Sequence, residues 1–476
     1  MESILSDKKI FLILRYAAGV TVFVLAAFLA RFGNGVPSTL LFFTLMFLEA
    51  VLVYYETENI LDLRLLLSFS WLGGIALSSL KLSELQSPWS LAMWFSVGGF
   101  YFLYLASFDL VSFLLGKRIG DRRHRRSIIT YRRNPVFRRA VFSAILILTA
   151  VDILAFILEC FILHFNVPIF ANWSYEAYSN FHVTGLHYFT VSLVLVTPLT
   201  AYYLFLGQPS ARGWIVLIIC CALSLLVPFL ILSKMQMLLT LAFPIFVFLV
   251  IQEKVPKRVI LAGTMAFAVL VLGVFIVLMR FKDYPENYLE GVFRFKNQET
   301  PLALQYPYIY IVNNFENLNL LTVKLQRYSY GIREMFPFFA LTGLKFVPKV
   351  GQLYNLEQYL TCEELSTLTI LYHAYGDFGV VGTFVFGTIL GAASAVLTDF
   401  SYRRKSIGGV LFYVQFAMYM ALSFFTTWFS DATTWFYFIA TGAIVVYIRI
   451  YFRMNSRGRR PAEKKAEESN DKRPDN

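Results

Sequence analysis

The sequence predicts an all-α protein that crosses a membrane many times. Of its 476 residues, 58% are hydrophobic and only 15% are charged, and the mean hydropathy is +0.61. The chain contains many apolar runs of about 20 residues, the length that an α-helix needs to cross roughly 30 Å of hydrocarbon. The alternating ten-residue pattern of a transmembrane barrel is absent. These observations exclude a soluble domain and favour a bundle of membrane-spanning helices.

We expect about twelve spans, because that number of apolar runs is separated by polar or charged connections. Each run is long enough for one crossing, and two short spans fit into the 39 residues of 214–252 at about 1.5 Å per residue. The predicted spans are 10–30, 36–54, 61–80, 89–116, 140–164, 186–206, 214–232, 236–252, 259–279, 378–398, 408–428 and 432–452.

One segment gives a strong orientation signal. Between 117 and 139 the chain carries ten lysines and arginines against one acid, Asp121. Such segments stay in the cytoplasm, which places both termini inside as well. The net charge of +12 therefore mainly reflects the orientation of the chain in the membrane. We expect the basic segments to contact membrane lipids, and we do not expect the protein to bind nucleic acid. After a membrane domain spanning 1–454, the charged tail 455–476 is predicted to be disordered and cytoplasmic.

Two segments remain for the outer side, a short one at 164–189 and a long one at 280–377. In the long segment the charges nearly cancel, and Tyr, Asn and Gln are frequent. Apolar residues at helical spacing in 306–331 predict amphipathic helices that lie on the membrane. Pro and Gly residues in 336–355 predict irregular structure. One large loop on one face indicates a site at the outer membrane surface.

Lone basic residues at span ends are the first candidate site residues. Lys234 lies in "SKMQ", the predicted outward turn between two short spans, and Arg280 ends its span on the same side. A lysine or arginine there is either an anchor that reaches the headgroups or a cation that binds an anion. Two such cations beside a large loop favour a phosphate site.

Histidine and acidic side chains next to a predicted span form a second group. His373 and Asp377 lie one helical turn apart in "HAYGDFG", where ionisable groups are costly unless they have a partner or a function. Asp377 could instead cap the following helix, and His373 could be a satisfied polar residue. The four cysteines show no disulfide or zinc spacing, and His182 and His187 pair badly on a helix. No metal site is predicted.

Four short patterns between Asn166 and Gly391 resemble one family. They are "VPIF" followed by "EAYSNFHVTGL", then "SKMQMLL", then an arginine that closes a span, Arg280, and then a Thr and a Tyr before "GDFGVVG". In this order they resemble the oligosaccharide repeat-unit polymerases of bacterial surface polysaccharides, the Wzy-type O-antigen and capsule polymerases. The chain departs from the pattern at Tyr178 and Lys234, where an arginine is expected.

The resemblance implies a metal-independent glycosyltransferase of the bacterial plasma membrane with a GT-C-like fold. Such an enzyme transfers a growing glycan from undecaprenyl pyrophosphate to the terminal sugar hydroxyl of a second lipid-linked repeat unit. The donor carries its own leaving group, so no cofactor is required. A flippase and a chain-length regulator are the protein partners that the resemblance implies.

This chemistry assigns roles to the candidate residues, because the departing pyrophosphate needs cations and the acceptor hydroxyl needs a base. The predicted pyrophosphate-binding residues are Lys234 and Arg280, with Arg327 and Arg333 in reserve. The predicted catalytic residues are His373 and Asp377, with Glu316 as an alternative base. The predicted contacts to the acceptor and glycan are Tyr178, His182, Glu316 and Tyr372.

Three other functions stay open. A ligase that moves the finished glycan to another acceptor shares the topology and the donor, but would normally show a histidine in a different loop motif. A transferase that uses a monosaccharide polyprenyl phosphate usually has an acidic pair in its first outer loop, and 30–38 has none. A transporter or flippase tends to show inverted repeats and polar residues at mid-membrane, and no repeat is visible.

Overall fold

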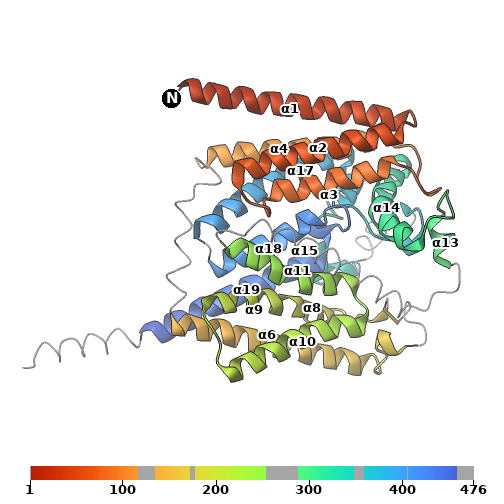
Figure 1. The fold of residues 1–476 in the computed structure, drawn as a ribbon. Coiled ribbons are helices and arrows are strands. Elements are labelled where there is room, and N and C mark those ends of the chain that lie inside the picture. Colours follow the sequence, from red (N-terminus) through yellow and green to blue (C-terminus); the bar gives the residue numbers. More distant parts are fainter. Residues whose placement is uncertain are drawn as a thin grey trace, which may run out of the picture. The chain divides into compact units, whose positions relative to one another are not determined.

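Helices make up most of the part of the protein that the structure describes (Figure 1). The computed structural model describes residues 2–115, 134–171, 177–178, 180–252, 288–347, 359–404 and 406–457. Within these ranges no strand forms, and the one extended contact is an isolated bridge between Ser83 and Phe295. The predicted all-α, multi-pass membrane fold is confirmed.

Nine helical segments of the described chain are long and apolar enough to cross a membrane. They are α1 (Glu2–Arg31), α2 (Gly35–Thr57), α4 (Leu91–Leu114), α6 (Pro135–Ile162), the segment Leu186–Leu206, α10 (Ala211–Ile231), α11 (Lys234–Ile251), α17 (Tyr372–Arg404) and α19 (Ala432–Arg457). Two shorter apolar helices are α3 (Leu63–Ser79) and α18 (Ile407–Ala421). The nine long segments overlap nine predicted spans, and the two shorter helices overlap the predicted spans 61–80 and 408–428, whose crossing of the membrane stays a prediction. The predicted span 259–279 lies outside the described residues, so the total of twelve stays a prediction.

Local capping decides where several of these helices begin. The side chain of Asn134 accepts hydrogen bonds from the N–H groups of Val136 and Phe137, so α6 starts at Pro135, five residues before the predicted span. Ser90 caps α4 in the same way through the N–H of Met93. Such caps satisfy N–H groups that have no partner inside the helix.

Rows of exposed apolar side chains follow the long helices. On α17, Val381, Val385 and Ile389 lie one turn apart and are 66%, 52% and 63% exposed. A helix surface of this kind would be unfavourable in water but suits contact with lipid.

The chain forms two compact units within the predicted membrane domain. Unit 1 comprises 1–122, 284–399 and 416–435, and unit 2 comprises 123–283, 400–415 and 436–476. Unit 1 contains α1–α4, α13 (Tyr288–Phe293), α14 (Leu302–Lys324), α15 (Phe336–Leu341) and most of α17. Unit 2 contains α6, α8 (Leu186–Ser192), the 3₁₀ turn η3 (Leu193–Leu195), α9 (Val196–Leu206), α10 and α11.

Two glycines let α17 approach α4 closely within unit 1. A Cβ atom on Gly387 would lie 2.8 Å from the carbonyl oxygen of Phe100, and one on Gly391 would collide with the carbonyl oxygen of Tyr104. The side chain of Ser107 adds a 2.7 Å hydrogen bond to the carbonyl of Thr388. Small residues four apart are a common way for membrane helices to pack.

A buried network of charges joins α1, α2, α3 and α4. Arg15 pairs with Glu49, at 2.5 Å, and Arg64 pairs with Asp62 and Asp109, at 3.2 and 2.8 Å. The Arg64 side chain is only 1% exposed. Buried charges are tolerated only when they are paired and hydrogen-bonded, so these ion pairs constrain how the four helices meet. The sequence analysis did not single out any of these residues.

The environment of helix α14 differs from the one predicted from the sequence. We predicted amphipathic helices lying on the membrane here, but α14 packs against α3 and α4 and its polar residues are buried. Asn313 and Asn317 donate hydrogen bonds to the carbonyl of Leu365, and Asn317 also donates to that of Thr367. The polar face therefore binds other parts of the chain instead of water.

The segment predicted to be irregular is partly helical. It contains the single-turn helix α15 and the 3₁₀ turn η4 (Leu344–Phe346), and residues 348–355 lie outside the described chain.

Candidate functional site

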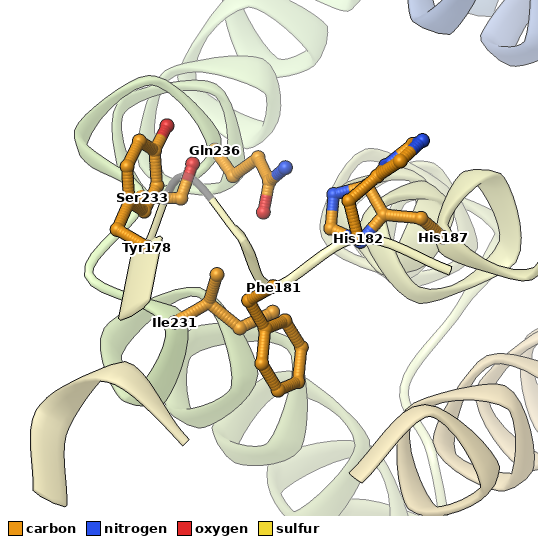
Figure 2. A pocket seen from close by; sticks show the side chains of 7 residues that line it. All are labelled: Tyr178, Phe181, His182, His187, Ile231, Ser233 and Gln236. Carbon is orange, nitrogen blue, oxygen red and sulfur yellow. The ribbon is translucent and has the colours of Figure 1, made fainter. Parts of the chain in front are cut away.

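Unit 2 contains a pocket of about 250 Å³ (Figure 2). One wall comes from the segment before and at the start of α8, and the other from the turn between α10 and α11. Two of the short patterns found in the sequence, "EAYSNFHVTGL" and "SKMQMLL", thus contribute to the same cavity. The lining residues are Tyr178, Phe181, His182, His187, Ile231, Ser233 and Gln236.

A buried carboxylate positions the first wall. Glu159, near the end of α6, accepts a hydrogen bond from the N–H of Val183 and contacts Nδ1 of His187, both at 2.9 Å. The side chain of Glu159 has no exposed surface. The ring of His187 lies 5.0 Å, centroid to centroid, from that of His182. The two histidines that pair badly on a helix are therefore brought together by a turn, and Glu159 orients one of them.

The second wall is a tight turn. Leu232 adopts a left-handed conformation with φ of 62°, and Ser233 precedes the first residue of α11, Lys234. The turn thus occurs at 232–233, one residue earlier than predicted from "SKMQ". Ser233 is 4% exposed, and its hydroxyl does not cap the helix. Oε1 of Gln236 is buried and accepts no hydrogen bond from the part of the chain that the structure describes.

The composition of the pocket suits a sugar. Tyr178 and Phe181 offer aromatic faces, while Ser233, Gln236 and His182 offer groups that donate or accept hydrogen bonds. The N-terminus of α11 also carries a partial positive charge, which favours an anion nearby. Lys234 stands at this terminus and is half-buried, but it is not one of the lining residues.

Unit 1 contains a second polar cluster, centred on Asp377. Its carboxylate accepts hydrogen bonds from the hydroxyl of Ser329 and from the backbone N–H groups of Arg333, at 3.2 Å, and Glu334, at 2.8 Å. The N–H of Tyr330 also donates to the carbonyl of Asp377. Asp377 is completely buried. These bonds attach the loop 329–334 to α17. The expected alternative was that Asp377 caps the helix that follows it.

Helix α17 is interrupted directly after Asp377. Phe378 (φ −140°, ψ 17°) and Gly379 (φ 62°, ψ −146°) leave the helical conformation. Glycine adopts a positive φ without strain, so the sharp turn predicted for "GDFG" occurs at Gly379. A Cβ atom there would also lie 2.8 Å from the hydroxyl of Tyr328.

Arg333 lies beside this break. It is 4% exposed, and its guanidinium packs on Gly376, where a Cβ atom would collide with Nη1. Burial lowers the pKa of Arg333, and the charge of Asp377 opposes that effect. A buried cation at a helix break has the charge needed to bind an anion.

His373 and Tyr372 are both buried in this cluster. Nδ1 of His373 lies 2.7 Å from the hydroxyl of Ser430, and the residue is 4% exposed. The hydroxyl of Tyr372 donates to the carbonyl of Tyr359 at 3.3 Å. Both side chains therefore have protein partners.

Glu316, on α14, binds the segment between α3 and α4 in unit 1. One oxygen, Oε1, accepts from Lys81 at 2.5 Å and Trp89 at 2.7 Å, and the other accepts from the N–H of Ser87 at 3.1 Å. Burial lowers the pKa of Lys81, against the effect of Glu316. Arg327 is exposed on the loop that follows α14.

The structure thus divides the predicted site residues. Tyr178 and His182 line the pocket of unit 2. Arg333, Tyr372, His373 and Asp377 lie in unit 1, as do Glu316 and Arg327, whereas Arg280 falls outside the described residues. The sequence analysis assigned no site role to several residues that take part in the pocket or the cluster, namely Glu159, His187, Ser233, Gln236, Ser329, Glu334 and Ser430. For Glu159, an acid within an apolar run was the signal that could have revealed it.

Comparison of the chain with protein-family models, with curated proteins and with solved structures found no match. Among the described residues, no group of three or more His, Cys, Asp or Glu side chains is arranged to hold a metal ion.

Proposed function

We propose that the protein polymerises oligosaccharide repeat units linked to undecaprenyl pyrophosphate, at the outer face of a bacterial plasma membrane. The reaction joins C1 of the donor glycan to a hydroxyl of the acceptor's terminal sugar and releases undecaprenyl pyrophosphate. A multi-pass helical protein suits substrates whose lipid tails stay in the bilayer.

The observation that carries this proposal is the pocket of unit 2. It is lined by two aromatic residues and several hydrogen-bonding groups, including a buried serine that does not cap its helix and a buried amide oxygen without a partner in the described chain. Sugar rings need both kinds of group, one for their apolar faces and one for their hydroxyls. The pocket also combines two of the four patterns on which the family resemblance rests.

Charge next to the pocket supports a phosphate-containing substrate. Lys234 begins α11, where the helix dipole and unbonded N–H groups also favour an anion. Cations placed near a departing pyrophosphate stabilise the negative charge that develops on it. In this proposal Lys234 has that role in unit 2, and Arg280, Arg327 and Arg333 remain proposed contacts.

The test is elongation of a synthetic lipid-linked repeat unit by the purified protein in lipid nanodiscs. We expect a ladder of longer glycans. Tyr178→Ala and Gln236→Ala should each weaken the ladder, because they remove an aromatic face and an amide from the pocket. The matched control is Tyr55→Ala, which removes a tyrosine that is 81% exposed on α2. A full ladder from both pocket variants would contradict the pocket's role, and no ladder from the unaltered protein would contradict polymerisation.

Transport of a lipid-linked glycan is a second candidate, favoured by the charge network of α1–α4. Ionisable residues inside membrane helices often mark a transport pathway. Arg15, Glu49, Arg64 and Asp109 are such residues, although all are paired in the structure. Proteoliposomes decide between the candidates, since a transporter moves the labelled lipid across the bilayer without lengthening its glycan.

A further inference from the structure

The proposed reaction needs a base at the pocket of unit 2, where the sugar is proposed to bind. A base must lie within hydrogen-bond reach of the hydroxyl that it deprotonates. The catalytic residues predicted from the sequence, His373 and Asp377, are buried in unit 1 and hydrogen-bonded to other parts of the chain. Of the described residues that line the pocket, His182 and His187 carry the side chain that enzymes use most often as a base.

The ring of His187 is held in a fixed orientation. Its Nδ1 lies 2.9 Å from Oε1 of Glu159, and the same oxygen accepts a hydrogen bond, also of 2.9 Å, from the N–H of Val183. Because a carboxylate oxygen only accepts hydrogen bonds, this contact places the ring hydrogen on Nδ1. In the neutral ring the other nitrogen, Nε2, then keeps a lone pair that can accept a proton.

The imidazole of His187 is open to the pocket. Glu159 is not one of the lining residues, whereas His187 lines the cavity and its side chain is 18% exposed. The two nitrogens of an imidazole point in different directions, so holding Nδ1 against Glu159 turns Nε2 away from the buried carboxylate. In the view of Figure 2 the rings of His182 and His187 lie together, and the amide of Gln236 extends toward them.

The other groups that the reaction needs lie in the same unit. Lys234 begins α11 and stands in the sequence between two lining residues, Ser233 and Gln236. Oε1 of Gln236 is buried and accepts no hydrogen bond from the described chain, so a hydroxyl of a bound sugar can supply the missing donor. A sugar in the pocket therefore contacts both the wall that carries His187 and the wall that leads to Lys234.

We propose that Nε2 of His187 accepts the proton of the acceptor's sugar hydroxyl during glycosyl transfer, an inference that rests on the proposed polymerase function. The hydroxyl oxygen forms a bond to C1 of the donor sugar while the bond from C1 to the pyrophosphate oxygen breaks. The proton passes to Nε2, and the electron pair of the broken bond leaves on undecaprenyl pyrophosphate. Water then takes the proton from His187, which restores the neutral ring.

Glu159 is a positioning residue in this step. It holds Nδ1, and with it the orientation of the ring, and its negative charge stabilises the imidazolium that forms when Nε2 takes the proton. The carboxylate has no exposed surface, and charges attract each other more strongly in a buried site than in water. The pair Glu159–His187 thus combines a fixed geometry with a favourable charge.

The first experiment compares His187→Gln with His164→Gln in the elongation assay with the synthetic lipid-linked repeat unit. Glutamine keeps an N–H group that can donate to Glu159, but its amide does not take up a proton. We therefore expect kcat to fall about 10²–10⁴-fold with little change in KM. His164 is an exposed histidine of the same predicted outer segment, and its replacement should leave the rate unchanged. Glu159→Gln should also lower kcat more than it changes KM.

A second experiment separates proton transfer from packing. His187→Ala removes the ring, and imidazole added to the solution should then restore elongation. Pyrazole has nearly the same shape but is a much weaker base, so it should not restore elongation at the same concentration. Equal recovery with both compounds, or recovery with neither, would overturn the inference.

The kinetic results also distinguish this inference from the proposed function. If the unaltered protein elongates glycans and His187→Gln does so equally well, the inference is wrong and the polymerase function stands. A raised KM with an unchanged kcat in His187→Gln would mean that His187 only binds the sugar, and would overturn the inference too. If the unaltered protein elongates nothing, the proposed function itself fails.

Discussion

Replacement of Glu159 by leucine should release one wall of the pocket in unit 2. Leucine has a similar size but cannot accept the hydrogen bonds from Val183 and His187, each of which is 2.9 Å long. Hydrogen bonds to a charged group contribute about 1.5–3 kcal/mol each, so losing both costs at least about 3 kcal/mol. Since about 1.4 kcal/mol corresponds to a factor of ten, the segment should open about 100-fold more often.

Hydrogen–deuterium exchange read by mass spectrometry measures this opening directly. Peptides that contain 181–187 should exchange about 100-fold faster in Glu159→Leu, while peptides from α10 keep their rate. Glu159→Gln keeps an acceptor oxygen and loses only the charge, so its effect should be smaller, about tenfold. Unchanged exchange at 181–187 in a folded Glu159→Leu protein would refute the claim that Glu159 holds the wall.

Three further predictions concern function, packing and topology. Lys234→Ala should lower elongation about 10²–10³-fold while Lys234→Arg is tolerated, because only the charge is needed; equal activity of both would make Lys234 an anchor. Gly391→Ala should destabilise the protein by about 1–3 kcal/mol in thermal unfolding, because the added methyl group meets the α4 backbone, whereas Gly442→Ala, with no atom within 4 Å, should be neutral. Single cysteines in 281–376 should react with an impermeant reagent from outside and those in 120–135 should not; the reverse pattern would invert the topology.

Hydropathy predicted most of the helices because a bilayer sets their length. Nine predicted spans overlap long apolar helices and two more overlap shorter ones, and at some helix starts the difference comes from a side chain that caps the helix. Asn134 is an example, since it starts α6 five residues before the apolar run becomes obvious. Such caps depend on single residues, and an average over a window of about 20 residues does not detect them.

The environment of α14 was not predictable in the same way. Its apolar spacing indicated a helix, and its asparagines indicated a polar face. A polar face can meet water, headgroups or other parts of the protein, and local sequence does not distinguish these. The partners of Asn313 and Asn317 include Leu365, 52 and 48 residues further along the chain. Only the tertiary fold shows that these side chains are buried.

Local sequence likewise does not show which partners the polar atoms of the candidate site have. Asp377 and His373 attracted notice because ionisable residues are rare next to a membrane span, but the partners of Asp377 lie 43 to 48 residues away, and they occupy both of its oxygens. Glu334 stands in an ordinary polar loop, and nothing in its neighbours distinguishes it from other glutamates of that segment. What separates the two carboxyl groups is hydrogen bonding, because one is satisfied by the loop and the other keeps an acceptor oxygen without a partner in the described chain. A residue's chemical type can thus be read from the sequence, whereas the partners of its polar atoms depend on contacts that only folding creates.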